Sequence, residues 1–251
     1  MKSSYKRKPF NALTLVELLV VIAVICILAA LLFPGISGSK ENAKRTLCMN
    51  DLRQLGTGIH MYLDDQYNGS PGSSNATHSP FLAWTDYRDL IKNYVGVKGA
   101  ASAQDRVFAC PSDTFFYDMR KNGQGYVPHP MHEQADHAFT SYAYNAGMFS
   151  TPPTTNSPGT TNYYGIAGRR LETVRNPART VLIAEVPAFS PYSWHQPKRP
   201  LIKDNATFND ARNMVCFIDG HSSYLKIYFN GKKIAWDYDP PAGYDYQWGG
   251  D

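Results

Sequence analysis

The chain has 251 residues, of which 43% are hydrophobic and 13% aromatic, so it is rich enough in apolar side chains to fold and is not an intrinsically disordered protein. The formal net charge is +4, and four of the 25 basic residues lie in the first twelve positions; without them, 21 basic residues balance 21 acidic ones. A body of balanced charge offers no basic stripe that would bind the phosphates of a nucleic acid, and no nucleic-acid partner is expected.

The N-terminus combines a basic segment, 1–12, with an apolar run of 21 residues, 13–33. As a helix that rises about 1.5 Å per residue, this run spans about 30 Å, the thickness of a bilayer's hydrocarbon core. We therefore expect a transmembrane helix whose basic end stays in the cytoplasm. A secretory signal peptide is the alternative, but the run is longer than is usual and Glu17 sits near its start.

Residues 34–67 are predicted to continue this helix beyond a kink at Pro34. Apolar residues recur there at spacings of three and four, which indicates an amphipathic helix with one face on a folded domain. The apolar positions are Ala43, Leu47, Cys48, Leu52, Leu55, Ile59, Tyr62 and Leu63.

The remainder, 68–251, is predicted to be an extracytoplasmic globular α+β domain in which a small antiparallel sheet packs on the long helix. A Pro-, Thr- and Ser-rich stretch at 150–161 reads as an exposed loop. The segment 180–186 is a buried-strand run, and 213–218 and 221–229 flank an Asp219-Gly220 turn. A second turn at Asn230-Gly231 predicts a further short strand at 233–236.

Glu17 is the most informative single residue, because a carboxylate among leucines and valines is costly unless it is paired or near an interface. Two interpretations are open. The side chain reaches the cytoplasmic headgroups, or it pairs with a positive charge from its own or a neighbouring subunit.

The segment 12–19, ALTLVELL, resembles the processing site of type IV prepilins and type II secretion pseudopilins. The resemblance implies that a prepilin peptidase cuts between Ala12 and Leu13 and that the new amine of Leu13 is methylated. It also implies that this amine meets Glu17 of a neighbouring subunit in a filament. Ala12 stands where the family usually has glycine and Leu13 where it often has phenylalanine, whereas Pro34 agrees with a helix-kinking proline that is frequent in the family.

The rest of the chain is similar to pseudopilin-like proteins of the planctomycete and verrucomicrobia type. Asn209 stands where that group usually has a histidine, so no role of that histidine is carried over. The similar segments are 48–62, 110–113, 141–145, 176–184 and 218–221.

The two resemblances imply a structural subunit, not an enzyme, with a pilin-like fold. It would cross the inner membrane once, with its C-terminal domain in the periplasm. It would later be part of a filament or be located at the cell surface. The implied partners are prepilin peptidase, other pilin or pseudopilin subunits, the inner-membrane assembly machinery and the lipid bilayer.

The cysteines, at 26, 48, 110 and 216, lack the spacing of a metal cluster, so no metal site and no cofactor is expected. Cys48 and Cys110 form either a disulfide that ties the helix to the first loop, or a pair of reduced, partly buried thiols. Several oxygen-bearing residues are either calcium ligands or turn and cap residues, although their spacing matches no calcium motif. These residues are Asp113, Asn145, Asp204, Asp210 and Asp219.

Two other functions remain as alternatives. A membrane-tethered module would bind carbohydrate or protein through the aromatic tail, 236–248, without polymerising. The alternative interpretation of that tail is that it forms the edge of the core. A hydrolase built from His221, Asp219 and Ser222 or Ser223 is disfavoured, because neighbours in a strand point to opposite faces and no nucleophile elbow is present.

Overall fold

The computed structural model describes residues 14–66, 83–118, 125–146, 165–166, 170–198, 207–231 and 235–250, without the side chains of residues 30–37, 66, 83, 86 and 236. The predicted cleavage site at Ala12 and Leu13, the loop at 150–161 and Asp204 lie outside the described residues. The kink at Pro34 stays a prediction.

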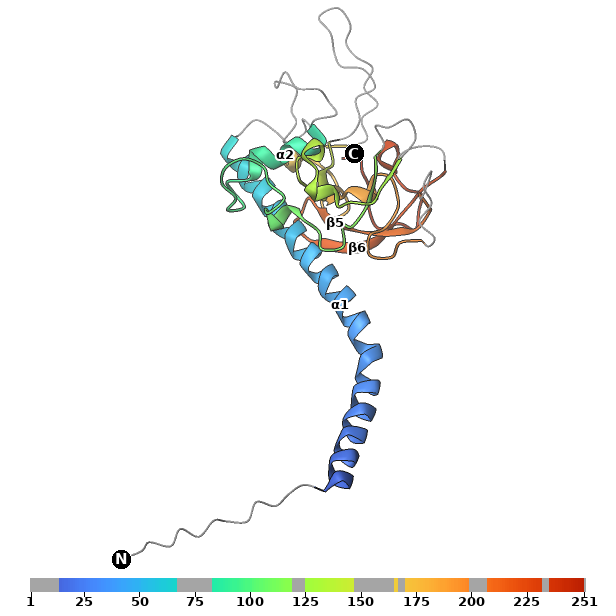
Figure 1. Ribbon diagram of the computed structural model, residues 1–251. Coiled ribbons are helices and arrows are strands. Elements are labelled where there is room, and N and C mark those ends of the chain that lie inside the picture. Colours follow the sequence, from blue (N-terminus) through green and yellow to red (C-terminus); the bar gives the residue numbers. More distant parts are fainter. Residues whose placement is uncertain are drawn as a thin grey trace, which may run out of the picture. The chain divides into compact units, whose positions relative to one another are not determined.

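One helix, α1 (Leu15–Gln66), provides the predicted long N-terminal helix (Figure 1). The chain divides into two compact units, Met1–Ala43 and Lys44–Asp251, and α1 contributes to both. In the described part of the chain, no helix combines the length and the apolar character that a bilayer crossing requires. The predicted transmembrane half, 13–33, includes residues outside that part.

The second half of α1 carries the predicted apolar stripe. Cys48, Leu52, Leu55 and Ile59 are fully buried and belong to the main core of the domain, which confirms the amphipathic pattern. Leu47 was also expected on this face, but it is 53% exposed. Because successive residues turn by about 100° around a helix, Leu47 points away from the stripe that Cys48 begins.

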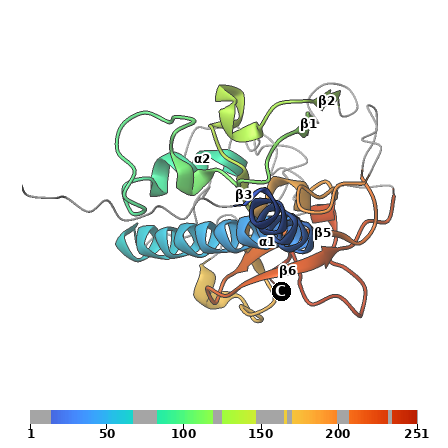
Figure 2. The ribbon, with the colours of Figure 1, turned by 60° about the horizontal axis from the view of Figure 1, so that its bottom comes forward.

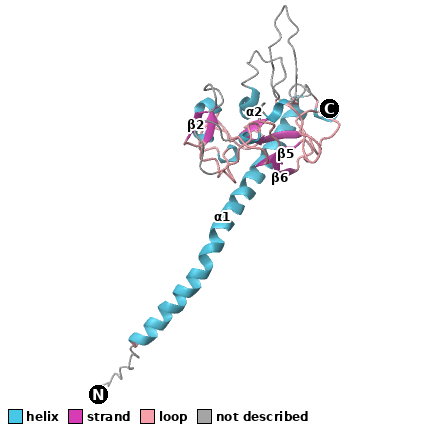
Figure 3. Ribbon diagram, turned by 90° about the vertical axis from the view of Figure 1, so that its right-hand side faces the viewer, coloured by secondary structure: helices cyan, strands magenta, loops and turns pink. Residues whose placement is uncertain are grey.

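The rest of Lys44–Asp251 confirms the α+β class. A four-stranded antiparallel sheet has the order β3-β4-β5-β6, and a separate two-stranded sheet pairs β1 with β2 (Figure 3). The strands are β1 (Phe116–Asp118), β2 (Gly125–Val127), β3 (Tyr142–Tyr144), β4 (Val181–Glu185), β5 (Ala211–Phe217) and β6 (Ser222–Ile227).

Among the described residues, helix α2 (Ala83–Ile91) and six 3₁₀ helices complete the elements. The short helices are η1 (Arg106–Phe108), η2 (Met131–Glu133), η3 (Ala135–His137), η4 (Leu171–Thr173), η5 (Val186–Ala188) and η6 (Ala235–Asp237).

The predicted hairpin is confirmed: β5 and β6 pair antiparallel on either side of Asp219 and Gly220, and Gly220 has a φ of +88°. The strand expected at 233–236 is wrong for its described residues, because Ala235 lies in η6. Its buried side chain and its backbone N–H, which donates to the Phe189 carbonyl at 3.0 Å, hold it beside η5. Strand β6 therefore remains an edge strand of the described sheet.

Two glycines of α1 allow other elements to approach the helix closely from two sides. A Cβ atom at Gly56 would lie 2.8 Å from the Cys216 sulfur of β5, and one at Gly58 would lie 2.6 Å from a methyl group of Val95. Residues two apart point about 200° from each other around a helix. In agreement, α2 and the β5–β6 hairpin lie on opposite sides of this part of α1 in Figure 2.

The aromatic tail is largely part of the core. Trp248 and Tyr246 are buried, and the Trp248 ring lies 4.9 Å from that of Phe189. Tyr238 and Tyr244 are partly exposed. The two buried rings are unavailable to a soluble ligand.

The close approach at Gly58 predicts that Gly58→Ala destabilises the domain, by about 1–3 kcal/mol, because the added methyl group overpacks against the stiff side chain of Val95. Gly38→Ala is the matched control, since Gly38 lies on the same helix with open space around its Cβ position. The control should change stability by no more than about 1 kcal/mol, and in the stabilising direction. Denaturant unfolding of the full chain in detergent measures both; equal effects of the two variants would contradict the packing argument.

The carboxyl group of Asp51 in α1 is expected to make the stability of the domain depend on pH. Partial burial raises the pKa of its carboxyl group to about 7, although the hydrogen bond from the Tyr142 hydroxyl, at 3.3 Å, opposes the rise. The folded pKa exceeds the unfolded one, so this contribution to stability is fully present below about pH 4 and is lost as the pH rises to about 7.

The variant Asp51→Asn removes this titration and keeps an oxygen for Tyr142. Its melting temperature should match that of the unaltered chain at pH 4 and exceed it at pH 8, as followed by near-ultraviolet circular dichroism. If the melting temperatures of the variant and the unaltered chain differ by the same amount at both pH values, Asp51 is not the source of the pH dependence.

Candidate functional site

The start of α1 is closed by a reciprocal pair of hydrogen bonds between Thr14 and Glu17. One carboxylate oxygen of Glu17 accepts from the Thr14 backbone N–H at 2.8 Å and from the Thr14 hydroxyl at 2.7 Å. The Glu17 N–H in turn donates to the Thr14 hydroxyl oxygen at 3.3 Å. This is a capping box, and the spacing Thr-x-x-Glu before an apolar run is a sequence signal that predicts one.

The capping box adds a third interpretation of Glu17 to the two that the sequence leaves open. Within a single chain, the carboxylate already has a partner at its own helix end. Thr14 and Glu17 are both exposed, so the same carboxylate is accessible to a second chain.

A disulfide joins Cys48 of α1 to Cys110, which follows η1, across a sequence separation of 62 residues. Both residues are fully buried, and their Cα atoms lie 5.2 Å apart, a separation typical of disulfides. A cross-link over a loop of this length stabilises a fold by about 2–4 kcal/mol. It fastens α1 to the segment that leads into β1.

A buried carboxylate and a buried imidazole lie beside the disulfide. Glu185 ends β4, and its Oε1 atom lies 2.9 Å from His195 Nε2 and 3.2 Å from the Cys110 sulfur. The same sulfur lies 3.8 Å from His195 Nε2. The second oxygen of Glu185 accepts the Met214 backbone N–H at 2.9 Å.

These four side chains, Cys48, Cys110, Glu185 and His195, form what we call the tetrad. Their potential ligand atoms all lie within 4.8 Å of one another, and no other group of three or more His, Cys, Asp or Glu side chains in the described residues converges in this way. The sequence analysis missed the tetrad because spacing rules detect ligands that are close along the chain.

The residues considered for calcium are used in separate local contacts. Asp113 is buried and accepts hydrogen bonds from the backbone N–H groups of Met131 and His132 and from the Ser141 hydroxyl. The Asn145 amide donates to the Val181 and Trp248 carbonyls. Asp210 accepts a hydrogen bond from the Tyr244 hydroxyl, and Asp219 lies against the ring of His221. The structure does not bring Asp113, Asp210 and Asp219 together.

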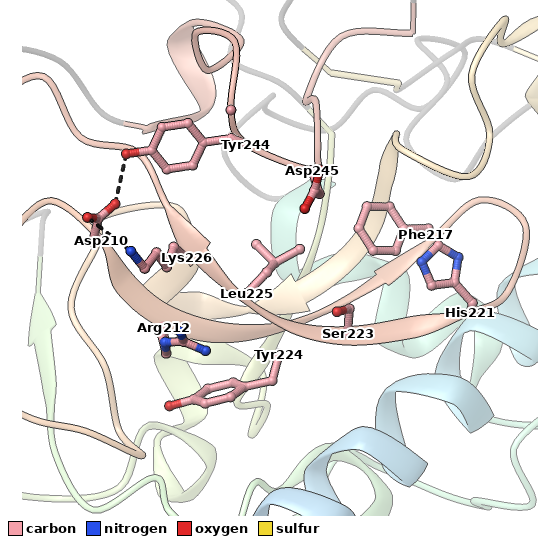
Figure 4. A pocket seen from close by; sticks show the side chains of 11 residues that line it. Asp210, Arg212, Phe217, His221, Ser223, Tyr224, Leu225, Lys226, Tyr244 and Asp245 are labelled. Atoms are coloured by element: carbon pink, nitrogen blue, oxygen red, sulfur yellow. Dashed lines mark hydrogen bonds and ion pairs between the residues drawn. The ribbon is translucent and has the colours of Figure 1, made fainter.

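A groove of about 530 Å³ lies over the β5–β6 hairpin (Figure 4). At one end the Tyr244 hydroxyl donates to Asp210 at 2.8 Å. At the other, the His221 ring stacks on Phe217 with ring centroids 4.3 Å apart, and its Nδ1 atom lies 2.6 Å from an oxygen of Asp219. The groove lining is Asp210, Arg212, Phe217, His221, Ser223, Tyr224, Leu225, Lys226, Gly243, Tyr244 and Asp245.

The groove does not contain the hydrolase site that was considered for His221, Asp219 and Ser222 or Ser223. His221 and Asp219 do interact, but Ser222 is buried and is not hydrogen-bonded to either of them. No serine hydroxyl of the described residues is hydrogen-bonded to the His221 ring. The contacts of His221 with Phe217 and Asp219 stabilise the hairpin turn.

Comparisons with known proteins find one family model and one relative that match parts of the chain. Residues 7–33 match the family described as the prokaryotic N-terminal methylation motif. The chain is also 36% identical over 61 residues to the type II secretion system core protein G of Pectobacterium carotovorum subsp. carotovorum. That match covers 24% of this chain and spans 37% of the length of the relative. No solved structure matches the chain.

The matched motif, 7–33, includes the predicted cleavage site, the capping box and the first part of α1. Residues 7–33 therefore carry the prokaryotic N-terminal methylation motif, and over part of its length the chain is similar to a type II secretion system core protein.

Proposed function

We propose that this chain is a structural subunit of a type IV pilus-like or type II secretion pseudopilus filament. In this proposal a prepilin peptidase removes residues 1–12. Before assembly, the subunit is stored in the inner membrane with its C-terminal domain in the periplasm. The inner-membrane assembly machinery then packs it against other pilin or pseudopilin subunits. The observation that carries the proposal is an acidic residue, Glu17, within the otherwise apolar and exposed segment of α1 from Leu15 to Leu28.

The exposed apolar surface of α1 supports this function. The large hydrophobic side chains from Leu15, which is 77% exposed, to Leu28, which is 56% exposed, are open on every side of the helix. A continuous apolar surface of this kind is unfavourable in water and marks a membrane or protein contact. The proposal assigns it first to lipid and then to the helices of neighbouring subunits.

The capping box supports a defined role for Glu17. In the stored subunit, Thr14 supplies the hydrogen bonds that the carboxylate needs. After the proposed cut, the charged amine of Leu13 in a neighbouring subunit provides a stronger, charge-assisted partner in apolar surroundings. Assembly would exchange a local hydrogen-bonded pair for an ion pair between subunits.

A second candidate function is favoured by the groove on the β5–β6 hairpin. Its partly exposed aromatic and charged side chains suit a tethered module that binds carbohydrate or protein. This function needs no polymer. Binding of a soluble glycan by the full chain, with no filament formed in cells, would favour it over the first.

Processing predicts a defined N-terminus. Mass spectrometry of the chain from a host with its prepilin peptidase should give a peptide that begins at methylated Leu13, and this peptide should vanish when the peptidase is deleted. The variant Ala12→Gly restores the residue usual in the family and should be cut at least as completely. A chain that begins at Met1 in both hosts, or one cut beyond Phe33, would exclude processing at this site.

The charge of Glu17 is predicted to be required for assembly. Glu17→Gln keeps an oxygen that can accept the Thr14 hydrogen bonds but has no charge, so it should enter the membrane normally and lose most filament incorporation. Thr14→Ala is the matched variant, because it removes the hydroxyl of the capping box and keeps the carboxylate. It should lower helix stability by only about 1 kcal/mol and still assemble.

Sheared filaments and membrane fractions, probed for each variant, measure the two outcomes. If Glu17→Gln assembles like the unaltered chain, the ion pair is wrong. If Thr14→Ala fails as completely as Glu17→Gln, the capping box and not the charge is the essential feature.

A further inference from the structure

We propose that the tetrad is a zinc site when its two cysteines are reduced, so that the disulfide and the metal-bound form are two states of the same four residues. The proposal concerns the interior of Lys44–Asp251 and does not depend on filament formation. The four residues come from α1, from the segment after η1, from the end of β4 and from the segment after η5.

The donor set fits zinc by its chemistry. Two cysteine sulfurs, one imidazole nitrogen and one carboxylate oxygen are the ligand types that zinc prefers, and four is its usual number in structural sites. Two thiolates and a carboxylate carry three negative charges, which would be costly to bury without a cation. A zinc ion neutralises two of them, and the Met214 N–H that donates to Glu185 Oε2 stabilises part of the third.

The geometry is close to that of a tetrahedral site. With zinc–sulfur distances of about 2.3 Å and zinc–nitrogen or zinc–oxygen distances of about 2.0–2.1 Å, ligand atoms lie about 3.3–3.8 Å from one another. In the tetrad, Cys110 Sγ lies 3.8 Å from His195 Nε2 and 3.2 Å from Glu185 Oε1, and the latter two atoms are 2.9 Å apart. The two sulfurs are held closer by their bond, and reduction frees them to separate.

The surroundings orient the ligands before a metal arrives. The Met214 hydrogen bond fixes one oxygen of Glu185 and leaves Oε1 directed at His195 and Cys110. Hydrogen bonds of this kind to metal-binding carboxylates tune ligand orientation and affinity. All four residues are buried, which excludes water as a competing ligand.

The two states exchange by balanced chemistry. Zinc binding to the reduced pair releases the two thiol protons. A disulfide oxidant that later accepts two electrons from the zinc-bound thiolates is itself reduced to a dithiol, takes up two protons and leaves the Cys48–Cys110 bond and a free zinc ion. Proteins are made with reduced thiols and meet oxidants outside the cytoplasm, so the metal-bound form would come first. Either state fastens α1 to the same part of the domain.

The test uses the full chain in detergent, reduced with a phosphine under anaerobic conditions and freed of metals. Cobalt(II) reports on the site, because tetrahedral thiolate coordination gives intense visible absorption and a sulfur-to-metal charge-transfer band. We expect one equivalent of cobalt to produce both signals and one equivalent of zinc to remove them. The oxidised chain should give neither signal. Weak absorption typical of six oxygen ligands, or equal signals from the reduced and oxidised chains, would overturn the proposal.

Variants assign the signal to residues. Glu185→Gln and His195→Asn should each weaken cobalt binding by about 10–100-fold or more, and Cys48→Ser should lower the charge-transfer band. The matched control is Cys216→Ser, because Cys216 is a buried free cysteine outside the tetrad. It should leave the spectrum unchanged.

Folding of each variant is checked separately. Glu185→Gln and His195→Asn keep both cysteines, so near-ultraviolet circular dichroism of their oxidised forms shows whether the domain remains intact. A folded His195→Asn or Glu185→Gln variant that binds cobalt as tightly as the unaltered chain would overturn the assignment, as would loss of the signal in Cys216→Ser.

Discussion

The contact between α1 and the sheet is the constraint on which the rest of Lys44–Asp251 depends. Cys48, Leu52, Leu55 and Ile59 bury one stripe of the helix, and Gly56 lets the backbone come close to β5. A fully buried leucine or isoleucine contributes about 1.5–3 kcal/mol, so this stripe alone is comparable with the 5–15 kcal/mol by which a typical domain is stable. The tetrad exists only because Cys48 is held there.

The buried polar groups explain how such short strands are kept in place. Asp113 accepts hydrogen bonds from η2 and from Ser141, next to β3, and Glu185 connects β4 to β5 and His195. Buried Arg88 pairs with Asp105 and stacks over the Phe108 ring at 4.6 Å. A buried charge without a partner is strongly unfavourable, so each of these groups disfavours arrangements in which its partners are absent. They add specificity to a domain whose sheets are small.

The sequence predicts elements whose signals are local, and it fails where they are not. The stripe of α1 and the β5–β6 hairpin follow from helical periodicity and from an Asp-Gly turn. Strands β1, β2 and β3 have three residues each, too few for an alternating pattern. The strand expected after Asn230-Gly231 was wrong because tertiary contacts of Ala235 prevail over a turn signal. The tetrad brings together positions 48, 110, 185 and 195, which no spacing rule connects, whereas the capping box of Thr14 and Glu17 was visible in the sequence.

The apolar surface of α1 and the carboxylate of Glu17 have different roles in the proposed contact between subunits. An apolar helix surface attracts other apolar helices but does not fix their axial position. Contacts between leucine-like side chains are equally favourable at many axial offsets between the two helices. A single buried polar group can fix the axial offset, because only one offset gives that group a partner. A polar residue at a coiled-coil interface acts in the same way. Glu17 is the one acidic residue from Thr14 to Leu28, so it would select the offset at which a neighbour's amine reaches it. In this proposal, hydrophobic surface supplies the attraction and one carboxylate supplies the alignment.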